Sequence, residues 1–564
     1  MRTLIKTLLV FLIILFPSCE ENLTELNINH NGVDPSNVNP NLILPTIISS
    51  TALPYSKGNY NDDFAGVMQY VQKSGWGNVL NLFQWENEET WDYLYGNLRD
   101  ADHLYKRAGE EGMEFQQGIA IVIRAFNFGY IADTWGDAPY SAALNALNGE
   151  EEDMFPKFDS QESIYKGIIE ELKTANTLFS KSEGEYTGIS PDADILYGGK
   201  PVQWRKFTNS LMLRYYMRLS AKLPDYAKAG IEEVVSNASL YPIFTSVEDG
   251  AILDYIGSSR DDSWPEAVAF DATESNFTRI QLCAGFRDVL VDYNDPRIGV
   301  WFNKVVIPLK ISTQYGDDQI VDGVRYLHPD YLAENNLKIY NKETWVADIK
   351  DGKQLIDTME YAGLPIASTT GGGSGWNLNP QPIQGGPNVH NSALADMYKE
   401  SSGEFLKARL ISYAEVSFIL AEAAQKGWSV GGTQKDWYEK GVKASFDTWG
   451  VADKYTSYIA GEDVKYDGSL EQIMVQKWIA NWTVAHESWC DWRRTGYPKL
   501  SFGPKGYRNA MPLRYKYGSD EKARNDENYK SAIQNLQETP FTATDGKDSS
   551  WSKFWLLQGT ANPY

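Results

Sequence analysis

The feature that most constrains this fold is a set of segments in which apolar residues recur at spacings of three and four. Such spacing places apolar side chains on one face of an α-helix, so each segment is predicted to be a helix packed on other helices. We therefore expect a mainly α fold. The five stripes are Phe115, Ile119, Val122, Phe126 and Tyr130; Ile164, Ile168, Leu172 and Ala175; Trp204, Phe207, Leu211, Tyr215 and Leu219; Tyr413, Val416, Leu420 and Ala424; and Met474, Trp478, Trp482, Ala485 and Trp489.

Two local signals indicate how these helices begin and pair. Asp159-Ser160-Gln161-Glu162 looks like a capping box that opens the second helix. Ala421, Ala423 and Ala424 are small residues at positions where two helices pack closely. These features favour tetratricopeptide-like helical hairpins forming one superhelical body, although no strict repeat of about 34 residues is visible.

The helical period fades in two long stretches that are rich in Gly, Pro, Asn and Asp or otherwise irregular. We predict a single domain over residues 41–564, with a helical scaffold at about 41–245 and 405–500. Loop-rich insertions are expected at about 246–404 and 501–564, and binding residues are commonly found in such loops.

The N-terminus reads as an export signal. A short basic start precedes nine apolar residues from Leu8 to Phe16 and then Pro17-Ser18-Cys19. Nine residues are far fewer than the roughly 20 that cross a bilayer, so residues 1–18 are predicted to be a cleaved signal peptide. A small residue directly before a cysteine resembles a bacterial lipoprotein signal, which implies lipidation of Cys19.

Residues 19–40 then form a polar tether to the outer membrane. Glu20 and Glu21 directly follow the cysteine, and this resembles the acidic signal that sends lipoproteins of Bacteroidota to the cell exterior. The alternative is an ordinary signal peptide with an incidental cysteine.

Charge and aromatic content restrict the class of ligand. The chain carries 52 Lys and Arg against 75 Asp and Glu, a formal net charge of −23. Nucleic acid is therefore a poor partner, because the average field repels phosphate.

The 18 Trp, 34 Tyr and 22 Phe are too many for one compact core, so some are expected on surfaces that bind a ligand.

The sequence shows no signature of catalysis, metal binding or cofactor binding. His486-Glu487-Ser488-Trp489-Cys490 begins like a zinc-protease helix but has cysteine where the second histidine belongs. The glycines around Ser374 lack the spacing of a hydrolase nucleophile. No phosphate-binding glycine motif and no CxxC pair occurs. A pair of glycosidase carboxylates stays open, since spacing in sequence does not identify one.

Several motifs, in order and spacing, resemble the SusD/RagB family of surface lipoproteins of Bacteroidota, in its SusD-like branch. The similarity runs from about Leu42 to the C-terminus. Its marks are Arg124-Ala125, Asp133 to Tyr140, Pro156 to Asp159, Glu162 to Tyr165, Trp204 to Leu211, Arg214, Asp295-Pro296-Arg297, Tyr413-Ala414-Glu415, Ala421-Glu422-Ala423, Gln476-Lys477-Trp478, Glu487, and Asp491 to Pro498.

The resemblance implies a non-catalytic protein that captures a nutrient at the cell surface. A helical face is expected to dock on a SusC-like TonB-dependent transporter, to which the ligand, a glycan or in some relatives a peptide, is delivered. The rival interpretations are a peptide-capturing member of the same family and, less favoured, a surface-tethered glycoside hydrolase.

Aromatic residues outside the helical stripes are the candidate ligand contacts. Those beside Gly, Asn, Asp or Gln, together with their polar neighbours, are Trp76, Asn78, Gln84, Trp85, Trp264, Trp376 and Asn377. For each tryptophan the alternative is a buried residue that anchors a loop. The charged residues of the motifs are instead expected to pair between helices, namely Arg124, Glu415, Glu422, Glu487, Arg493 and Arg494.

Overall fold

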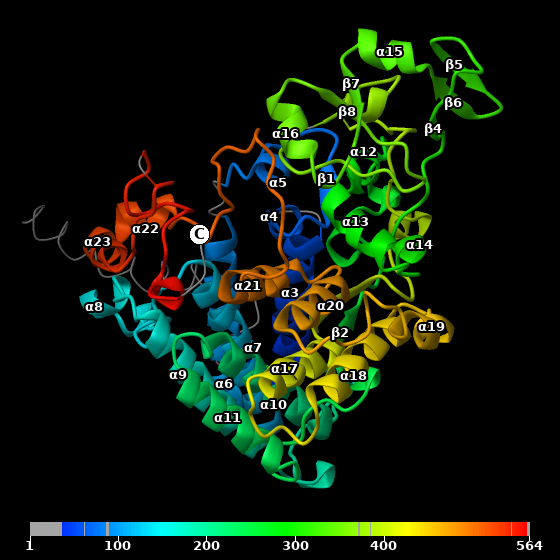
Figure 1. The fold of residues 1–564 in the computed structure, drawn as a ribbon. Coiled ribbons are helices and arrows are strands. Elements are labelled where there is room, and N and C mark those ends of the chain that lie inside the picture. Colours follow the sequence, from blue (N-terminus) through cyan, green and yellow to red (C-terminus); the bar gives the residue numbers. More distant parts are fainter. Residues whose placement is uncertain are drawn as a thin grey trace, which may run out of the picture.

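The computed structural model shows a helical body with smaller elements gathered at one end (Figure 1). The predicted signal peptide, Cys19 and most of the tether lie outside the described residues. The structure describes residues 37–60, 63–85, 89–369, 373–383, 385–542 and 544–560.

The first half of the scaffold is a series of helices that pack one on the next. In chain order, α6 packs on α7, α7 on α9, α9 on α10, and α10 on α11, while α3 packs on α6 and α7. These helices fill the lower half of the view in Figure 1. Their bounds are α3 (Pro40–Tyr60), α6 (Glu89–Glu110), α7 (Glu114–Thr134), α9 (Gln161–Leu178), α10 (Pro201–Leu219) and α11 (Pro224–Ser236).

The second half of the scaffold is formed near the other end of the chain. Helix α17 packs on α18, α20 and α10, so α17 joins the two halves. The buried core accordingly contains residues from both halves, from Leu44 to Leu557. The mainly α prediction is confirmed. The helices are α17 (Tyr413–Gln425), α18 (Gln434–Thr448), α19 (Tyr455–Ile459), α20 (Leu470–Ala480) and α21 (Ala485–Thr495).

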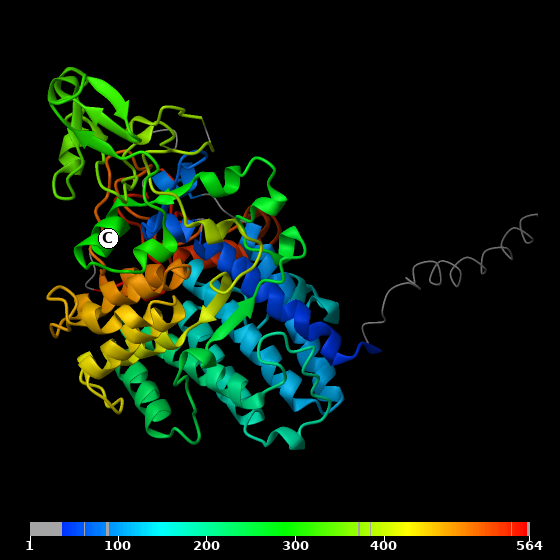
Figure 2. The same ribbon diagram turned by 90° about the vertical axis from the view of Figure 1, so that its right-hand side faces the viewer.

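The middle segment contains short helices and strands rather than loops alone. Figure 1 shows α15, α16 and β4 to β8 at the top, and Figure 2 shows the same group at one end of the body. Its elements are β2 (Ala251–Asp254), α12 (Ser275–Thr278), β3 (Ile280–Leu282), α13 (Ala284–Asp292), α14 (Ile298–Trp301), β4 (Leu309–Ile311), β5 (Asp318–Val321), β6 (Val324–Leu327), α15 (Pro329–Glu334), β7 (Leu337–Ile339), α16 (Trp345–Lys350) and β8 (Gln354–Ile356).

The described strands form four small sheets. Strand β6 lies between β4, which is parallel to it, and β5, which is antiparallel; β7 and β8 are parallel, and β2 pairs with β9 antiparallel. The remaining elements are α4 (Asp63–Val67), β1 (Val71–Lys73), α5 (Asn78–Leu82), α8 (Glu151–Met154), β9 (Lys407–Ile411), α22 (Ser519–Arg524) and α23 (Asp526–Gln534).

Two local predictions need correction. The fifth stripe spans two helices, because the chain leaves α20 at Ala480 and Thr483 adopts a left-handed φ of 73° before α21. Helix α9 is capped by Ser160, whose hydroxyl accepts from the Ser163 amide at 3.1 Å. Ser163 holds the place that a capping box gives to Glu or Gln, so only half of the box is present.

Buried ion pairs lock the helices together, as expected for the motif residues. Arg214 Nε on α10 lies 2.7 Å from the Glu415 carboxylate on α17. Arg218 reaches Glu487 on α21 at 2.6 Å. The remaining pairs include Arg494 with Glu422 at 2.6 Å and Arg124 with Asp102 at 3.1 Å.

Arg493 makes a different contact from the one expected. Its guanidinium stacks on the Trp489 ring, 3.4 Å from the centroid, and donates to the backbone oxygens of Asp133 and Leu513. It therefore links α21 to two distant segments of backbone.

None of the helices among the described residues has the length and apolar content that crossing a bilayer requires.

Candidate functional site

A cavity of about 650 Å³ opens between α3, β1, α6 and the segment 255–280, and we call it the α3–α6 cavity. Its wall combines polar and apolar surface, with several charged side chains and a half-exposed tyrosine. It is lined by Ser49, Ser50, Leu53, Pro54, Lys57, Lys73, Tyr93, Tyr255, Arg260, Asp261, Ser263, Pro265, Glu266, Asn276, Arg279 and Ile280.

Pairing of β1 with β3 builds one wall of this cavity. The two short strands are antiparallel, with Lys73 opposite Ile280. The Ser74 amide then donates to the Arg279 carbonyl at 2.8 Å. This pairing brings two basic residues that are about 200 positions apart in sequence to the same wall, and it places the turn after β1 beside Arg279.

Trp76 is the exposed aromatic of that turn. Its side chain is 62% exposed, and its backbone has a left-handed φ of 47°. The Arg279 guanidinium lies over the ring, 4.5 Å from the centroid. Arg279 is itself held by the Ser275 carbonyl at 2.8 Å and the Asn276 side chain at 2.7 Å. The ring is therefore oriented by the protein while much of it faces solvent, which is the arrangement that a stacking contact needs.

The cavity brings basic groups together. Lys57, Lys73, Arg260 and Arg279 line it together with two acidic residues, Asp261 and Glu266. Partial burial lowers the pKa of Arg279, but a guanidinium titrates so far above neutrality that it keeps its charge. Burial raises the pKa of Tyr255, so its phenol is a neutral hydrogen-bonding group. The wall thus offers charge, hydroxyls and aromatic surface to a polar ligand.

The neighbours of Trp76 occupy different environments. Asn78 is exposed and begins α5, and Gln84 is half-buried. Trp85 is only 2% exposed and packs against the rings of Phe64, Trp489 and Tyr515. Other side chains cover the Trp85 ring, so it has no face for a ligand and we leave it out of the proposed site.

Trp264 lies behind the cavity and not in its wall. It is 1% exposed and packs against Tyr60, Tyr255 and Tyr398, while Ser263 and Pro265 on either side line the cavity. Trp264 therefore anchors the loop that carries these neighbours, which is the alternative that the sequence left open. We also leave Trp264 out of the proposed set of ligand contacts.

Trp376 and Asn377 lie at a second cavity, of about 400 Å³, lined by Lys353, Lys505 and residues 373–377. The Trp376 side chain is 5% exposed, and its indole N–H donates to Asn391 at 3.2 Å. The Asn377 side chain accepts from the Asp357 amide at 2.7 Å and donates to the Asp357 carbonyl at 2.9 Å. Asn377 is thus committed to holding the loop, and Trp376 offers little ring surface to a ligand.

Sequence reasoning missed most residues of the α3–α6 cavity. Tyr93 on α6 is 43% exposed and lines it, yet Tyr93 lies within a segment where aromatic residues also serve packing, as Trp91 does at 3% exposure. Arg260 and Arg279 stand alone in irregular segments. Only the β1–β3 pairing brings such residues to Trp76, and single-sequence patterns contain no signal for it.

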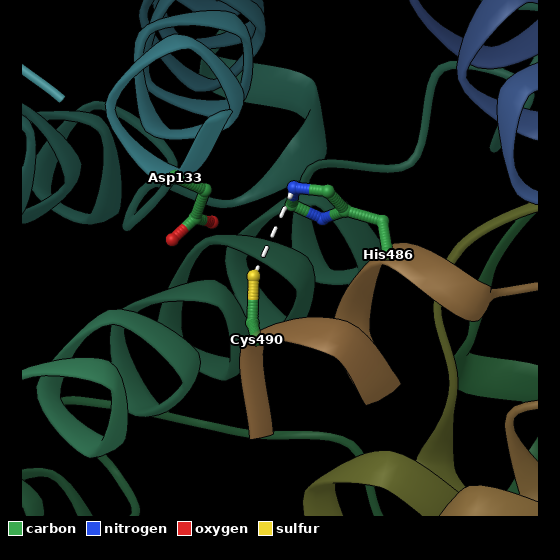
Figure 3. A group of neighbouring side chains, drawn as sticks. All are labelled: Asp133, His486 and Cys490. Atoms are coloured by element: carbon green, nitrogen blue, oxygen red, sulfur yellow. Dashed lines mark hydrogen bonds between the residues drawn. The ribbon is translucent and has the colours of Figure 1, made fainter. Parts of the chain in front are cut away.

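One group of metal-ligating side chains occurs among the described residues, formed by Asp133, His486 and Cys490 (Figure 3). All three are buried, and their ligand atoms lie within 4.8 Å of one another. Asp133 comes from α7, and the other two come from α21. Burial raises the pKa of the Cys490 thiol and lowers that of His486, which favours a neutral pair.

The neighbours of this group do not fit a metal centre. Arg218 Nε lies 2.8 Å from the Asp133 carboxylate, and Arg493 donates to the Cys490 sulfur at 3.0 Å. Tyr165 also donates to Asp133, at 2.6 Å. Two guanidinium groups already occupy the ligand atoms and would repel a cation. The group belongs to the buried network that joins α7, α10 and α21.

A family model described as starch-binding and associating with the outer membrane, SusD-like_2, matches residues 33–340 and 379–518. Among curated proteins no relative matches the chain.

Solved structures share the fold. A SusD homolog from Bacteroides fragilis superimposes with a TM-score of 0.67 at 20% identity, covering 92% of this chain and 99% of that one. A chitin-binding SusD homolog from Flavobacterium johnsoniae has a TM-score of 0.67 at 21% identity, with the same two coverages, 92% and 99%. A SusD homolog from Bacteroides uniformis has a TM-score of 0.66 at 22% identity, covering 93% and 100%.

Proposed function

The chain belongs to the SusD-like family of nutrient-binding proteins associated with the outer membrane, and on this premise we propose that it captures an oligosaccharide without cleaving it. We further propose that it is lipid-anchored, faces the cell exterior and delivers the ligand to a SusC-like TonB-dependent transporter. The observation that carries the proposal of capture is the exposed Trp76 ring beside the α3–α6 cavity. Trp76 is not a lining residue, but the Arg279 guanidinium, which lines the cavity, lies over its ring.

The chemistry of the cavity suits a sugar. A pyranose presents C–H groups on its faces, which pack on an aromatic ring, and hydroxyls at its edge, which pair with Arg, Asn and Asp. Trp76 and Tyr93 supply rings with exposed surface, and Asn276 and Asp261 supply polar edges. An aromatic contact adds about 0.5–1.5 kcal/mol beyond area burial. A few contacts therefore reach roughly the −4 to −8 kcal/mol of millimolar to micromolar binding, which permits release to a transporter.

Replacing the exposed ring tests this function. We expect Trp76→Ala to weaken binding of the recognised oligosaccharide by about 1–3 kcal/mol, with an unchanged melting temperature because the ring is 62% exposed. A glycan array identifies the ligand, and isothermal titration calorimetry measures the affinity of the parent and the variant.

Tyr507→Ala serves as the matched control, because Tyr507 is 51% exposed and its ring contacts Trp551 and Arg508, neither of which lines the α3–α6 cavity. Its affinity should equal that of the parent. Unchanged affinity together with a lowered melting temperature for Trp76→Ala would show that the ring is structural, and the proposal would then lose its main support.

Two rival functions are separated in the same assays. Competition by peptides, and not by oligosaccharides, would indicate a peptide-capturing protein of the same family. Asp261 and Glu266 are the acidic residues of the cavity, so shorter glycans released on incubation, and lost in variants of this pair, would indicate a glycoside hydrolase.

A further inference from the structure

The basic side chains of the α3–α6 cavity have no acidic partner within salt-bridge distance in the part of the chain that is described. Lys57, Lys73, Arg260 and Arg279 all line the cavity. The Arg260 guanidinium donates to the Phe270 carbonyl, and Arg279 donates to the Ser275 and Asn276 oxygens. These acceptors are neutral, so they orient the guanidinium groups without cancelling their charge.

The two lysines are less constrained. Lys57 is exposed and Lys73 is half-buried, and neither ammonium group donates to a side chain or carbonyl among the described residues. Strand β1 holds the backbone of Lys73 in place through its pairing with β3. A ligand group that reaches this wall would therefore meet two ammonium groups that are free to reorient toward it.

The acidic residues of the cavity do not balance these charges. Asp261 and Glu266 are set against four basic residues. Glu266 is 1% exposed. Burial is the main cause of the raised pKa of the Tyr60 and Tyr255 phenols, and the nearby Glu266 carboxylate raises both pKa values further. Glu266 therefore lines the cavity with little exposed surface. Together with Asp271 it acts electrostatically on Arg279, so the excess positive charge of the wall lies mainly on Lys57, Lys73 and Arg260.

This basic wall stands out in an acidic protein. The chain has a net charge of −23, and several of its buried scaffold arginines are ion-paired, as Arg214 is with Glu415 and Arg494 is with Glu422. A concave, basic surface on an acidic molecule attracts anions locally while the rest of the surface repels them. Guanidinium groups in particular pair with carboxylate and sulfate oxygens through two N–H groups at once.

We propose that the saccharide captured at the α3–α6 cavity is acidic, bearing carboxylate or sulfate groups that pair with Lys57, Lys73, Arg260 and Arg279. This inference rests on the proposed function, because it takes saccharide capture at this site as given. Arg279 links the two parts of recognition: its guanidinium lies 4.5 Å from the Trp76 ring centroid, so a sugar stacked on the exposed part of the ring carries its acidic group within reach of this charge.

The test compares each acidic chain with its own neutral form. Oligogalacturonides and alginate oligomers are titrated beside their carboxyl-reduced counterparts, and carrageenan oligosaccharides beside their desulfated counterparts, by calorimetry at low and high salt. We expect at least one acidic chain to bind about tenfold or more tightly than its neutral form, with an affinity that falls as salt rises. Carboxylated and sulfated chains distinguish the two sources of negative charge.

Charge-removing variants locate the effect. Lys57→Gln combined with Lys73→Gln should weaken binding of the acidic chain by about tenfold and leave binding of its neutral form unchanged. Folding is expected to be unaffected, since neither ammonium group is bonded within the described protein. Lys435→Gln, at an exposed position of α18 away from the cavity, removes one positive charge where the double variant removes two, and it should leave both affinities at parental values.

Five results would overturn the inference. Equal binding of acidic and neutral forms would show that charge does not select the ligand. A loss caused by Lys435→Gln as large as that of the double variant would show a general charge effect. Binding of polyglutamate in place of every saccharide would assign the basic wall to acidic peptides. If neutral chains alone bind and depend on Trp76, the proposed function stands and this inference fails, whereas binding of no saccharide at all refutes both.

Discussion

Trp76 and Trp264 are both flanked by Gly, Asn, Asp or Ser in the sequence, and the structure gives them opposite surroundings. Trp76 is 62% exposed beside Arg279, while Trp264 is 1% exposed among three tyrosines. Burying a tryptophan removes a large apolar area from water, so a loop that contains one buries it wherever the core is within reach. Trp76 is exposed in a turn where its backbone adopts a left-handed φ and the Arg279 guanidinium lies over its ring.

Glu422 is a residue whose charge we expect to matter for acid stability. Burial alone would raise the pKa of this carboxyl. The attraction and hydrogen bonds of the Arg494 guanidinium lower it, and together with the other nearby groups they bring the pKa below the ordinary 4.5. A carboxylate with a depressed pKa stabilises the folded state above its unfolded pKa, and this contribution is lost as pH falls through the folded value. Urea unfolding should therefore show a declining free energy of unfolding below about pH 4.5.

Glu422→Gln checks the source of this decline. Removing one partner of a buried pair costs about 3–5 kcal/mol at pH 7, and the variant should then lose less stability on acidification than the parent. Glu462→Gln is the control, because the Glu462 side chain is 84% exposed beside Lys465 and such a pair contributes about 0–1 kcal/mol. Parallel pH profiles for the parent and Glu422→Gln would contradict the assignment.

At the scale of elements, close helix packing depends on single glycines. Gly129 on α7 faces α10, and an added Cβ would lie 2.6 Å from Cε1 of the Tyr215 ring, whose hydroxyl donates to the Ala125 carbonyl at 3.1 Å. We expect Gly129→Ala to reduce the free energy of unfolding by about 1–3 kcal/mol, because α7 and α10 must separate. Denaturant unfolding followed by circular dichroism measures it.

Gly96 on α6 offers the opposite case. No atom lies within 4 Å of an added Cβ there, so Gly96→Ala should stabilise the protein by about 0.5–1 kcal/mol through helix propensity alone. The same substitution is thus expected to have opposite signs on two adjacent helices. A Gly129→Ala variant as stable as the parent or more so would mean that the packing of α7 on α10 does not limit stability.

At the scale of the whole molecule, lipidation of Cys19 is the proposed means of membrane attachment. We predict that Cys19→Ala is not lipidated and leaves the membrane fraction, because each CH₂ of an acyl chain contributes about 0.8 kcal/mol to membrane binding. Metabolic labelling with palmitate and cell fractionation measure this.

Mass spectrometry of the parent, purified gently in detergent, should in addition find a TonB-dependent transporter.

Cys283→Ala is the control for labelling, since Cys283 is buried in the folded protein and cannot carry the acyl chains. Cys283→Ala should incorporate as much palmitate label as the parent protein. Label that persists in Cys19→Ala would show that the lipid is attached elsewhere or that the resemblance to a lipoprotein signal is accidental.

The sequence by itself determined the helical scaffold, because a stripe such as Phe115 to Tyr130 has one stable solution, an amphipathic helix with that face buried. The sequence also indicated that charged residues of the helix motifs form ion pairs, because carboxylates such as Glu415 and Glu422 on apolar helices require a counterion when they are buried. The break at Thr483 escaped prediction, because the apolar spacing continues across it.

Only the tertiary structure decided the candidate site. Lys73 and Arg279 meet because β1 pairs with β3, and a three-residue strand carries too little sequence pattern to specify its partner. Likewise, whether a loop tryptophan is exposed, as Trp76 is, or buried, as Trp264 is, depends on the surface that the rest of the chain places beside it. Helices follow from local periodicity, whereas the cavity and its charge follow from contacts between residues far apart in the chain.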